Sequence, residues 1–249
     1  MSRQRFDFGG VEQYYFPHVD TLQTVLFVAP VLLFSVVAHE YAHGYAALKQ
    51  GDTTAKDLGR LTWNPVKHID PFLTILMPLM IGYFSNWQVI LGGAKPVPVN
   101  PANYRNYRRG DIIVSLAGVA ANGVLAILFT ALIMVAGFVA RIAPAAGDVV
   151  GAVQVASFFG ITINLVLIAF NLIPIPPLDG SHVVKHLLPP AWQIKYQQFG
   201  RYGFIVLIAL LYFGGGLLQT WMGPVFRLRL MLLQSVSGFF HPSFGDWFR

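Results

Sequence analysis

The sequence predicts an all-α membrane protein that crosses the bilayer several times. Of the 249 residues, 55% are hydrophobic and 11% are charged, whereas soluble domains carry about 25% charged residues. The mean hydropathy is +0.57, and several apolar runs reach the ~20 residues that a helix needs to cross a membrane. We therefore expect about four to six transmembrane helices.

Four apolar runs are long enough to span a bilayer, residues 21–48, 112–140, 149–175 and 202–222. A shorter run, residues 71–84, has prolines at its start and near its centre, so it either spans or forms a re-entrant or hairpin segment. We expect an extramembrane segment over residues 1–20, one transmembrane domain over residues 21–222 and a tail over residues 223–249. Arginines among the apolar residues of the tail predict an interfacial amphipathic helix or a partial span.

Positive charge predicts the orientation of these helices. Residues 49–70, 95–111 and 179–201 contain 11 of the 17 lysines and arginines, and short loops rich in these residues face the cytoplasm. With all three segments on that side, the N-terminus lies outside, and residues 71–94 are re-entrant or a hairpin. The basic residues are spread among loops and do not gather on one face, which argues against nucleic acid as a partner.

The first apolar run contains the motif His39-Glu40-Tyr41-Ala42-His43. On a helix, His39 and His43 lie on one face and can bind one zinc ion, while Glu40 is placed beside them as the base that activates water. Ionisable groups at membrane depth cost ~2.5 kcal/mol or more, so they are kept mainly where they function. The alternative to a zinc hydrolase site is a pair of hydrogen-bonded core histidines.

The chain has no cysteine, so the metal ligands are expected to be imidazoles and carboxylates. Asp179 is the candidate third ligand, because three prolines before it break the helix and leave a carboxylate at the break. Taken alone, Asp179 is more simply explained as a cap of the helix that follows. His182 and His186 form a second pair, but no glutamate lies between them, which favours a supporting or surface role over metal binding.

Several polar residues in this framework have two possible roles. Asn122, Ser157, Asn164 and Asn171 lie within apolar helices, where they either line a wet cavity or hydrogen bond between helices. Residues 94–99 are β-prone and contain prolines, so they either bind an extended substrate by strand addition or form an ordinary loop. His68 is expected in a loop or on the substrate side of the site.

Five motifs follow one another along the chain: His39 to His43, Gly59-Arg60-Leu61-Thr62-Trp63-Asn64-Pro65 to His68-Ile69-Asp70-Pro71, Gly93-Ala94-Lys95-Pro96-Val97-Pro98-Val99-Asn100, Ser115-Leu116-Ala117-Gly118, and Asn171 to Gly180. In order and context they resemble the site-2 protease family of intramembrane zinc metallopeptidases, over roughly residues 30–190. The chain departs from that family at Val119, where proline is usual, and at Phe72, where glycine is usual. No insertion is long enough for a PDZ-like domain, so the resemblance is to a small form.

The resemblance implies one zinc ion held by His39, His43 and Asp179, with Glu40 as general base. The implied reaction is hydrolysis of peptide bonds in transmembrane segments of other membrane proteins. It also implies that Asn171 handles substrate or intermediate, and Asn122 and His68 are further candidates on the substrate side. The expected location is a prokaryotic plasma membrane, with the site nearer the cytoplasm.

Two other classes of function remain, a multi-pass metal transporter and a zinc-binding scaffold without activity. A transporter usually repeats its broken helix in a second half, and this chain has one proline-broken segment with an aspartate and no second copy. An inactive scaffold is expected to lose the base or a ligand, and Glu40 and the candidate ligands are all present. Both classes therefore rank below the protease.

Overall fold

The computed structural model describes residues 21–77, 80 and 93–247, and every regular element within these residues is helical. Among the described residues, three helical stretches are long and apolar enough to cross a membrane, Leu26–Gln50, Tyr107–Ile142 and Pro144–Asn171, and the bent pair Pro190–Phe213 and Gly215–Ser235 would be a fourth if it is one span. The three stretches correspond to the helices α1 (Thr21–Gln50), α4 (Tyr107–Ile142) and α5 (Gly147–Asn171), the last preceded by the short turn η5 (Pro144–Ala146). The prediction of an all-α polytopic membrane protein is confirmed.

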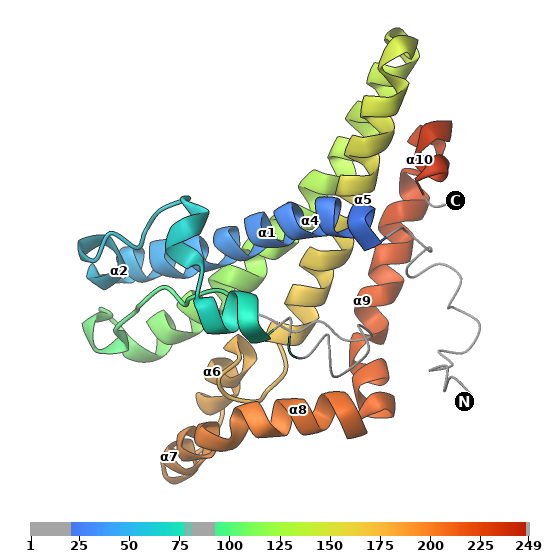
Figure 1. Ribbon diagram of the computed structural model, residues 1–249. Coiled ribbons are helices and arrows are strands. Elements are labelled where there is room, and N and C mark those ends of the chain that lie inside the picture. The colour runs from blue at the N-terminus through green and yellow to red at the C-terminus, as the bar shows by residue number, and fades with distance from the viewer. Residues whose placement is uncertain (1–20, 78–79, 81–92, 248–249) are drawn as a thin grey trace.

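The helices α4 and α5 form a long antiparallel hairpin, and α1 crosses both of them (Figure 1). The hairpin is held by a buried apolar cluster that includes Ala126 and Ile133 of α4 and Ile161 and Leu165 of α5. The α4 helix continues through Val119 without a break, so the departure from the usual proline there leaves the helix intact. The crossing brings the middle of α1, with its histidines, against the first half of α4.

The helix α1 ends where Gly51 adopts a φ of 112°. Gly51 N–H donates to Leu48 O at 3.2 Å and Asp52 N–H donates to Ala47 O at 2.9 Å, the pair of bonds that closes a helix on a left-handed glycine. Asp52 then accepts from Asn100 N–H at 2.7 Å and from Asn103 Nδ2 at 2.8 Å. The chain after α1 is thereby tied to residues 93–103.

In its described residues, the connection from α1 to α4 contains four short helices: α2 (Thr54–Asp57), η2 (Pro65–His68), the π-helical η3 (Pro71–Leu76) and η4 (Pro101–Asn103). Residues 93–100, which we call the strap, have no helical structure and pass beside α1. The predicted extramembrane segment, residues 1–20, and most of the predicted re-entrant segment, residues 71–94, lie outside the described residues. Within the described part of this connection, the strap reaches the candidate site through Val97, whose N–H donates to Glu40.

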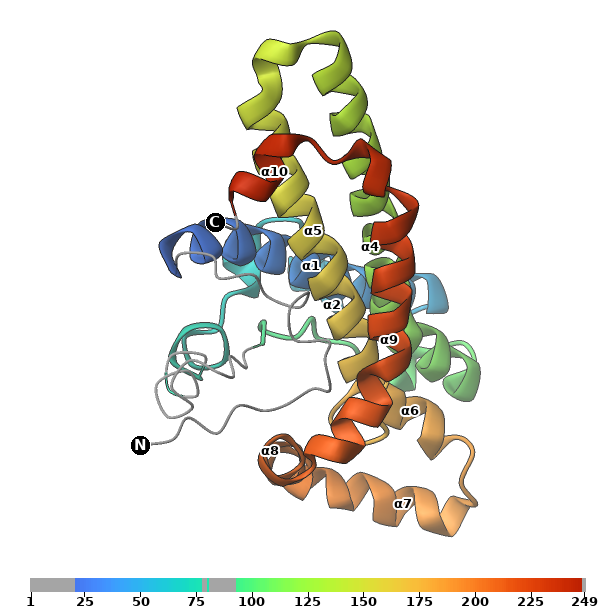
Figure 2. The same cartoon turned by 90° about the vertical axis from the view of Figure 1, so that its right-hand side faces the viewer.

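The C-terminal part contains α6 (Asp179–Lys185), α7 (Pro190–Phe199), η6 (Gly200–Tyr202), α8 (Gly203–Phe213), α9 (Gly215–Ser235), η7 (Ser237–Phe239) and α10 (Pro242–Asp246). The run 202–222, expected to be one continuous helix, is broken at Gly214, and the helices on either side are bent by 91°. Three consecutive glycines at 214–216 weaken the helix at this point. Figure 2 shows α9 alongside α5, and the boundary expected at residue 223 falls within α9.

Candidate metal centre

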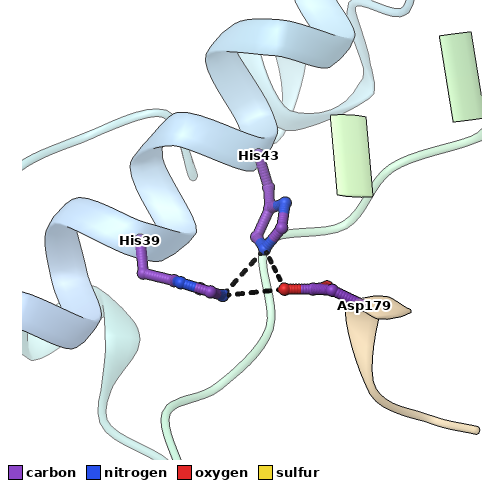
Figure 3. Close-up of side chains that lie close together, drawn as sticks. All are labelled: His39, His43 and Asp179. Carbon is purple, nitrogen blue, oxygen red and sulfur yellow. Dashed lines mark hydrogen bonds and ion pairs between the residues drawn. The ribbon is translucent and has the colours of Figure 1, made fainter. Parts of the chain in front are cut away.

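His39 and His43 lie one turn apart on α1 and point their rings toward the same space (Figure 3). Their Nε2 atoms are 2.9 Å apart. Each ring is held through its other nitrogen: His39 Nδ1 lies 2.6 Å from Asn122 Oδ1, and His43 Nδ1 lies 2.7 Å from Val114 O. Both acceptors are on α4, and donation from Nδ1 leaves each Nε2 with a free electron pair for a metal.

Asp179 is the first residue of α6 and faces both histidines (Figure 3). Its Oδ2 lies 3.2 Å from His39 Nε2 and 3.4 Å from His43 Nε2. The N-cap of α6 is Leu178, so Asp179 does not occupy the capping position that was its alternative role.

The three side chains fit a zinc ion. Ligands bound tetrahedrally at ~2.0–2.1 Å stand about 3.3 Å from one another, and the three ligand atoms here are 2.9, 3.2 and 3.4 Å apart. Two neutral imidazoles and one carboxylate form a ligand set that catalytic zinc sites use. Side-chain exposures of 8% for His39, 12% for His43 and 17% for Asp179 leave this centre shielded but reachable.

Asn122 belongs to a buried network that joins three helices. Its Nδ2 donates to Asn164 Oδ1 on α5 at 2.8 Å, and Asn164 Nδ2 donates to Ser35 Oγ on α1 at 2.9 Å. All three side chains are fully buried. Asn122, a candidate for contact with substrate, therefore lies behind His39 and orients its ring. Of the two roles expected for Asn122 and Asn164, the network corresponds to hydrogen bonding between helices.

Ser157 and Asn171 instead hydrogen bond to carbonyls of their own helix. Ser157 Oγ donates to Val153 O at 2.7 Å, and Asn171 Nδ2 donates to Leu167 O at 3.0 Å. Asn171 is the last residue of α5 and is partly exposed. The hydrogen bond to Leu167 uses its amide nitrogen, so its carbonyl oxygen is not engaged by this bond.

Glu40 follows His39 directly and reaches the strap. Its Oε2 accepts the backbone N–H of Val97 at 2.7 Å. The strap is held nearby, because Lys95 N–H donates to His68 O at 2.8 Å and Arg60 Nη2 donates to Lys95 O at 3.0 Å and to Pro96 O at 3.2 Å. These contacts fix one oxygen of the candidate base near the three candidate metal ligands.

His68 is fully buried in η2. Its Nε2 lies 2.9 Å from Thr62 O, so this hydrogen bond is made with the backbone and not with the three candidate ligands. His182 lies on α6 and His186 follows its last residue. Both contact Asp111 of α4, at 3.1 Å from Oδ1 and 2.7 Å from Oδ2 respectively. Lys185 Nζ also donates to Asp111 Oδ2. These basic residues hold α6, and with it Asp179, against the start of α4.

Reasoning from the sequence missed the role of Asp111, of Arg60 and of Gly118. A Cβ atom added to Gly118 would lie 2.5 Å from His39 Cε1 and 2.5 Å from His43 Nε2. Basic residues at 182, 185 and 186 on one face of a short helix were a signal for an acidic partner. No pattern in the sequence indicated that position 118 must lack a side chain, because this requirement depends on how α1 crosses α4.

These elements define the class as a multi-pass helical membrane protein with a two-histidine, one-aspartate centre beside a glutamate. The chain belongs to Peptidase family M50, the site-2 protease family, whose model matches residues 27–214. It is 38% identical over 223 residues to the "Putative zinc metalloprotease YwhC" of Bacillus subtilis (strain 168), covering 89% of this chain and 95% of that protein. It is 30% identical over 201 residues to the "Putative zinc metalloprotease Rip2" of Mycolicibacterium smegmatis, covering 77% and 71%. No solved structure matches the chain.

Proposed function

We propose that the protein is an intramembrane zinc metalloprotease that hydrolyses peptide bonds in transmembrane segments of other membrane proteins. The observation that carries the proposal is the convergence of His39, His43 and Asp179 within 3.4 Å of one another on helices that pack in an apolar framework. Membership of Peptidase family M50, and similarity to proteins named as zinc metalloproteases, support the proposal. One ion per chain is expected, because a single cluster of candidate ligands is found in the described part of the chain.

The residues of the site divide the work of hydrolysis between them. His39, His43 and Asp179 would hold the zinc ion, which when bound would act as a Lewis acid on water and on the scissile carbonyl. Asn122 and the carbonyl of Val114 keep the two imidazoles in the orientation and tautomer that binding requires. Glu40 takes a proton from the attacking water and returns it to the leaving amine.

Asn171 is proposed to contact the substrate or the reaction intermediate. It ends α5, eight residues before Asp179, and its side chain is partly exposed. Its amide nitrogen bonds to Leu167 O, which leaves the carbonyl oxygen for a polar group of the substrate. Asn171→Ala is expected to slow cleavage while zinc content stays at the wild-type level, and an unchanged cleavage rate would argue against this role.

Strand addition of the substrate to the strap is a second proposal on binding. Few backbone donors of the strap are left for a substrate, because the N–H groups of Lys95 and Val97 already donate within the chain. Pro96 and Pro98 have no N–H, so Val99 is the donor that remains between residues 95 and 99. Cleavage of a model substrate at the wild-type rate by Val99→Pro would count against the proposal.

We also propose that the site lies nearer the cytoplasmic face of the plasma membrane of a bacterial cell. The support is the concentration of lysine and arginine in residues 49–70, 95–111 and 179–201. Accessibility tags in residues 50–68 and 141–148 should then report opposite sides of the membrane. Labelling of both loops from the same side would exclude this orientation.

The proposed function is tested by cleavage of a transmembrane model substrate with purified protein in detergent. Wild-type protein should cleave, lose activity with a chelator and regain it with zinc, while Glu40→Gln stays inactive. Zinc flux across proteoliposomes measures the transporter alternative, and no flux is expected. A zinc-loaded wild type that neither cleaves this substrate nor transports zinc would favour the scaffold.

A further inference from the structure

We infer that Arg60 is a positioning residue for the proposed reaction, because it fixes the strap so that Val97 N–H can hold the carboxylate of Glu40. The inference rests on the proposed function, in which Glu40 is the base. The inference gives a role to the guanidinium of Arg60, which lies outside the candidate metal centre. Its hydrogen bonds described above go to the strap and not to the candidate ligands.

Arg60 binds two successive carbonyls of the strap. Its Nη2 donates to Lys95 O at 3.0 Å and to Pro96 O at 3.2 Å. The backbone of Arg60 is itself anchored, since its N–H donates to Ala55 O at 2.8 Å on α2. A charged guanidinium on two carbonyl oxygens is a stronger fixed point than a neutral hydrogen bond. The residues just before Val97 are therefore held in place from α2.

Val97 is the donor that this arrangement presents. Its N–H lies 2.7 Å from Glu40 Oε2, and the prolines on both sides have no N–H to take its place. The Val97 side chain is buried against α1, where a Cβ atom on Gly44 would lie 2.8 Å from Val97 Cγ1. Gly44 is one turn beyond Glu40, so the close approach of strap and helix occurs on the same side of α1 as the base.

The strap needs this anchor because it has no helix or sheet ladder of its own. Among the described residues, other hydrogen bonds of the strap lie to either side: Gly93 O accepts from Thr74 Oγ1, Lys95 N–H donates to His68 O, and Asn100 N–H donates to Asp52 Oδ2. Without Arg60, two strap carbonyls lose their donor next to Val97, and Val97 can move away from α1. Glu40 would then lose the bond that limits its side chain to one position.

The fixed bond also assigns roles to the two oxygens of Glu40. Oε2 is engaged by Val97 N–H, which leaves Oε1 free of this bond, and we expect Oε1 to take the proton. A base that can rotate away is correctly placed for a smaller fraction of the time, which lowers the rate of the chemical step. The bond from Val97 N–H to Glu40 uses neither the three candidate metal ligands nor Val99 N–H, the donor proposed above for the substrate. The loss should therefore appear chiefly in kcat.

The test compares Arg60→Gln with Arg60→Lys and with Lys67→Gln, a matched loss of charge at an exposed site on η2. Arg60→Gln should lower kcat by about 10- to 100-fold, with KM within about twofold and wild-type zinc content. Arg60→Lys should recover part of kcat, because an ammonium can donate to the same carbonyls. Lys67→Gln should match the wild type.

Hydrogen exchange gives a readout that does not depend on activity. Residues 95–99 have backbone N–H groups at Lys95, Val97 and Val99 alone, so a peptide over this segment resolves Val97 readily. Its amide should exchange slowly in the wild type and faster in Arg60→Gln. Val97→Pro, which removes the donor, should lose more of kcat than Val97→Ala, which keeps it.

Wild-type kcat in Arg60→Gln, an equal loss in Lys67→Gln, or unchanged exchange at Val97 would each overturn the inference. Loss of zinc from Arg60→Gln would also overturn it, since the residue would then act on the metal centre. These results differ from failure of the proposed function, which would appear as a zinc-loaded wild type that does not cleave.

Discussion

Gly118 of α4 lies directly against the ring of His39. A Cβ atom at this position would stand 2.5 Å from His39 Cε1 and 2.6 Å from His39 Nε2, and 2.5 Å from His43 Nε2. Carbon atoms in proteins do not approach this closely, so even one methyl group must displace the ligands or separate α1 from α4. The candidate metal centre therefore depends on the absence of a side chain at Gly118 as well as on its three candidate ligands.

Gly118→Ala is expected to weaken zinc binding by about tenfold or more, because both imidazoles must move. Helix propensity works in the opposite direction, since alanine favours a helix by ~1 kcal/mol over glycine. Gly123→Ala is the matched control on α4, where an added Cβ would meet nothing nearer than Ile168 Cδ1 at 3.9 Å. Competition with a chromogenic chelator measures both affinities, and equal affinities in the two variants would contradict the packing described here.

Asn122→Ala removes the acceptor of His39 Nδ1 and leaves the ring free to turn. We expect zinc affinity to fall by about 10- to 100-fold. Ser157→Ala is the control, because Ser157 is also fully buried but bonds to its own helix at Val153 O. If both variants retained wild-type affinity in the chelator assay, the network of Asn122, Asn164 and Ser35 would not be supporting the metal ligand.

Lys185→Met should destabilise the protein, because it leaves the buried carboxylate of Asp111 with less compensating charge. Asp111 is 3% exposed and Lys185 is 4% exposed, and breaking a buried pair of this kind costs ~3–5 kcal/mol. Lys195→Met, on the exposed surface of α7, should change stability little. Thermal unfolding in detergent measures both, and a double-mutant cycle with Asp111→Asn should show a coupling energy that differs from zero.

Stability should fall as the pH is lowered through the pKa of Asp52. Burial of Asp52 acts to raise its pKa, but hydrogen bonds from Asn100 N–H, Thr54 and Asn103 outweigh burial and lower it. A carboxyl with a lowered pKa in the folded state stabilises the fold above its unfolded pKa of about 3.9 and loses this contribution as pH falls through the folded pKa.

Thermal unfolding of wild-type protein and Asp52→Asn between pH 7 and lower values tests this dependence. Asp52→Asn should be less stable at neutral pH, and the difference between the two should shrink as the wild-type carboxyl becomes protonated. Asp57→Asn serves as the control at an exposed carboxyl whose described partner is Thr53 Oγ1. A constant difference between wild type and Asp52→Asn across the acidic range would contradict the assignment.

The apolar runs predicted α1, α4 and α5, because hydropathy and length are local properties of the sequence. Hydropathy did not reveal the bend at Gly214, since a run of glycines hardly changes the average over a window of residues. The spacing of His39 and His43 was readable for the same local reason. The prolines before Asp179 made it a candidate third ligand, and the resemblance implied the same role. Its distance from the histidines could not be predicted, because the path of residues 172–178 decides where α6 starts.

The contacts that complete the site could not be predicted from the sequence. Asn122 meets His39 across 83 positions in the chain, and Val97 meets Glu40 across 57. Both depend on the register between α1 and a distant segment, and asparagine in an apolar helix fits either a cavity or a helix contact. The structure was needed to show that Asn122 lies behind a candidate ligand.

The central claim is that His39, His43 and Asp179 hold one zinc ion while Glu40 stands outside the ligand set. The most direct measurement is the zinc content per chain of wild-type protein, Asp179→Ala and Glu40→Gln, determined by mass spectrometry on purified, folded samples. We predict about one zinc per chain for the wild type and for Glu40→Gln, and a large loss for Asp179→Ala. Loss of zinc from Glu40→Gln, or full retention of zinc by Asp179→Ala, would contradict this account.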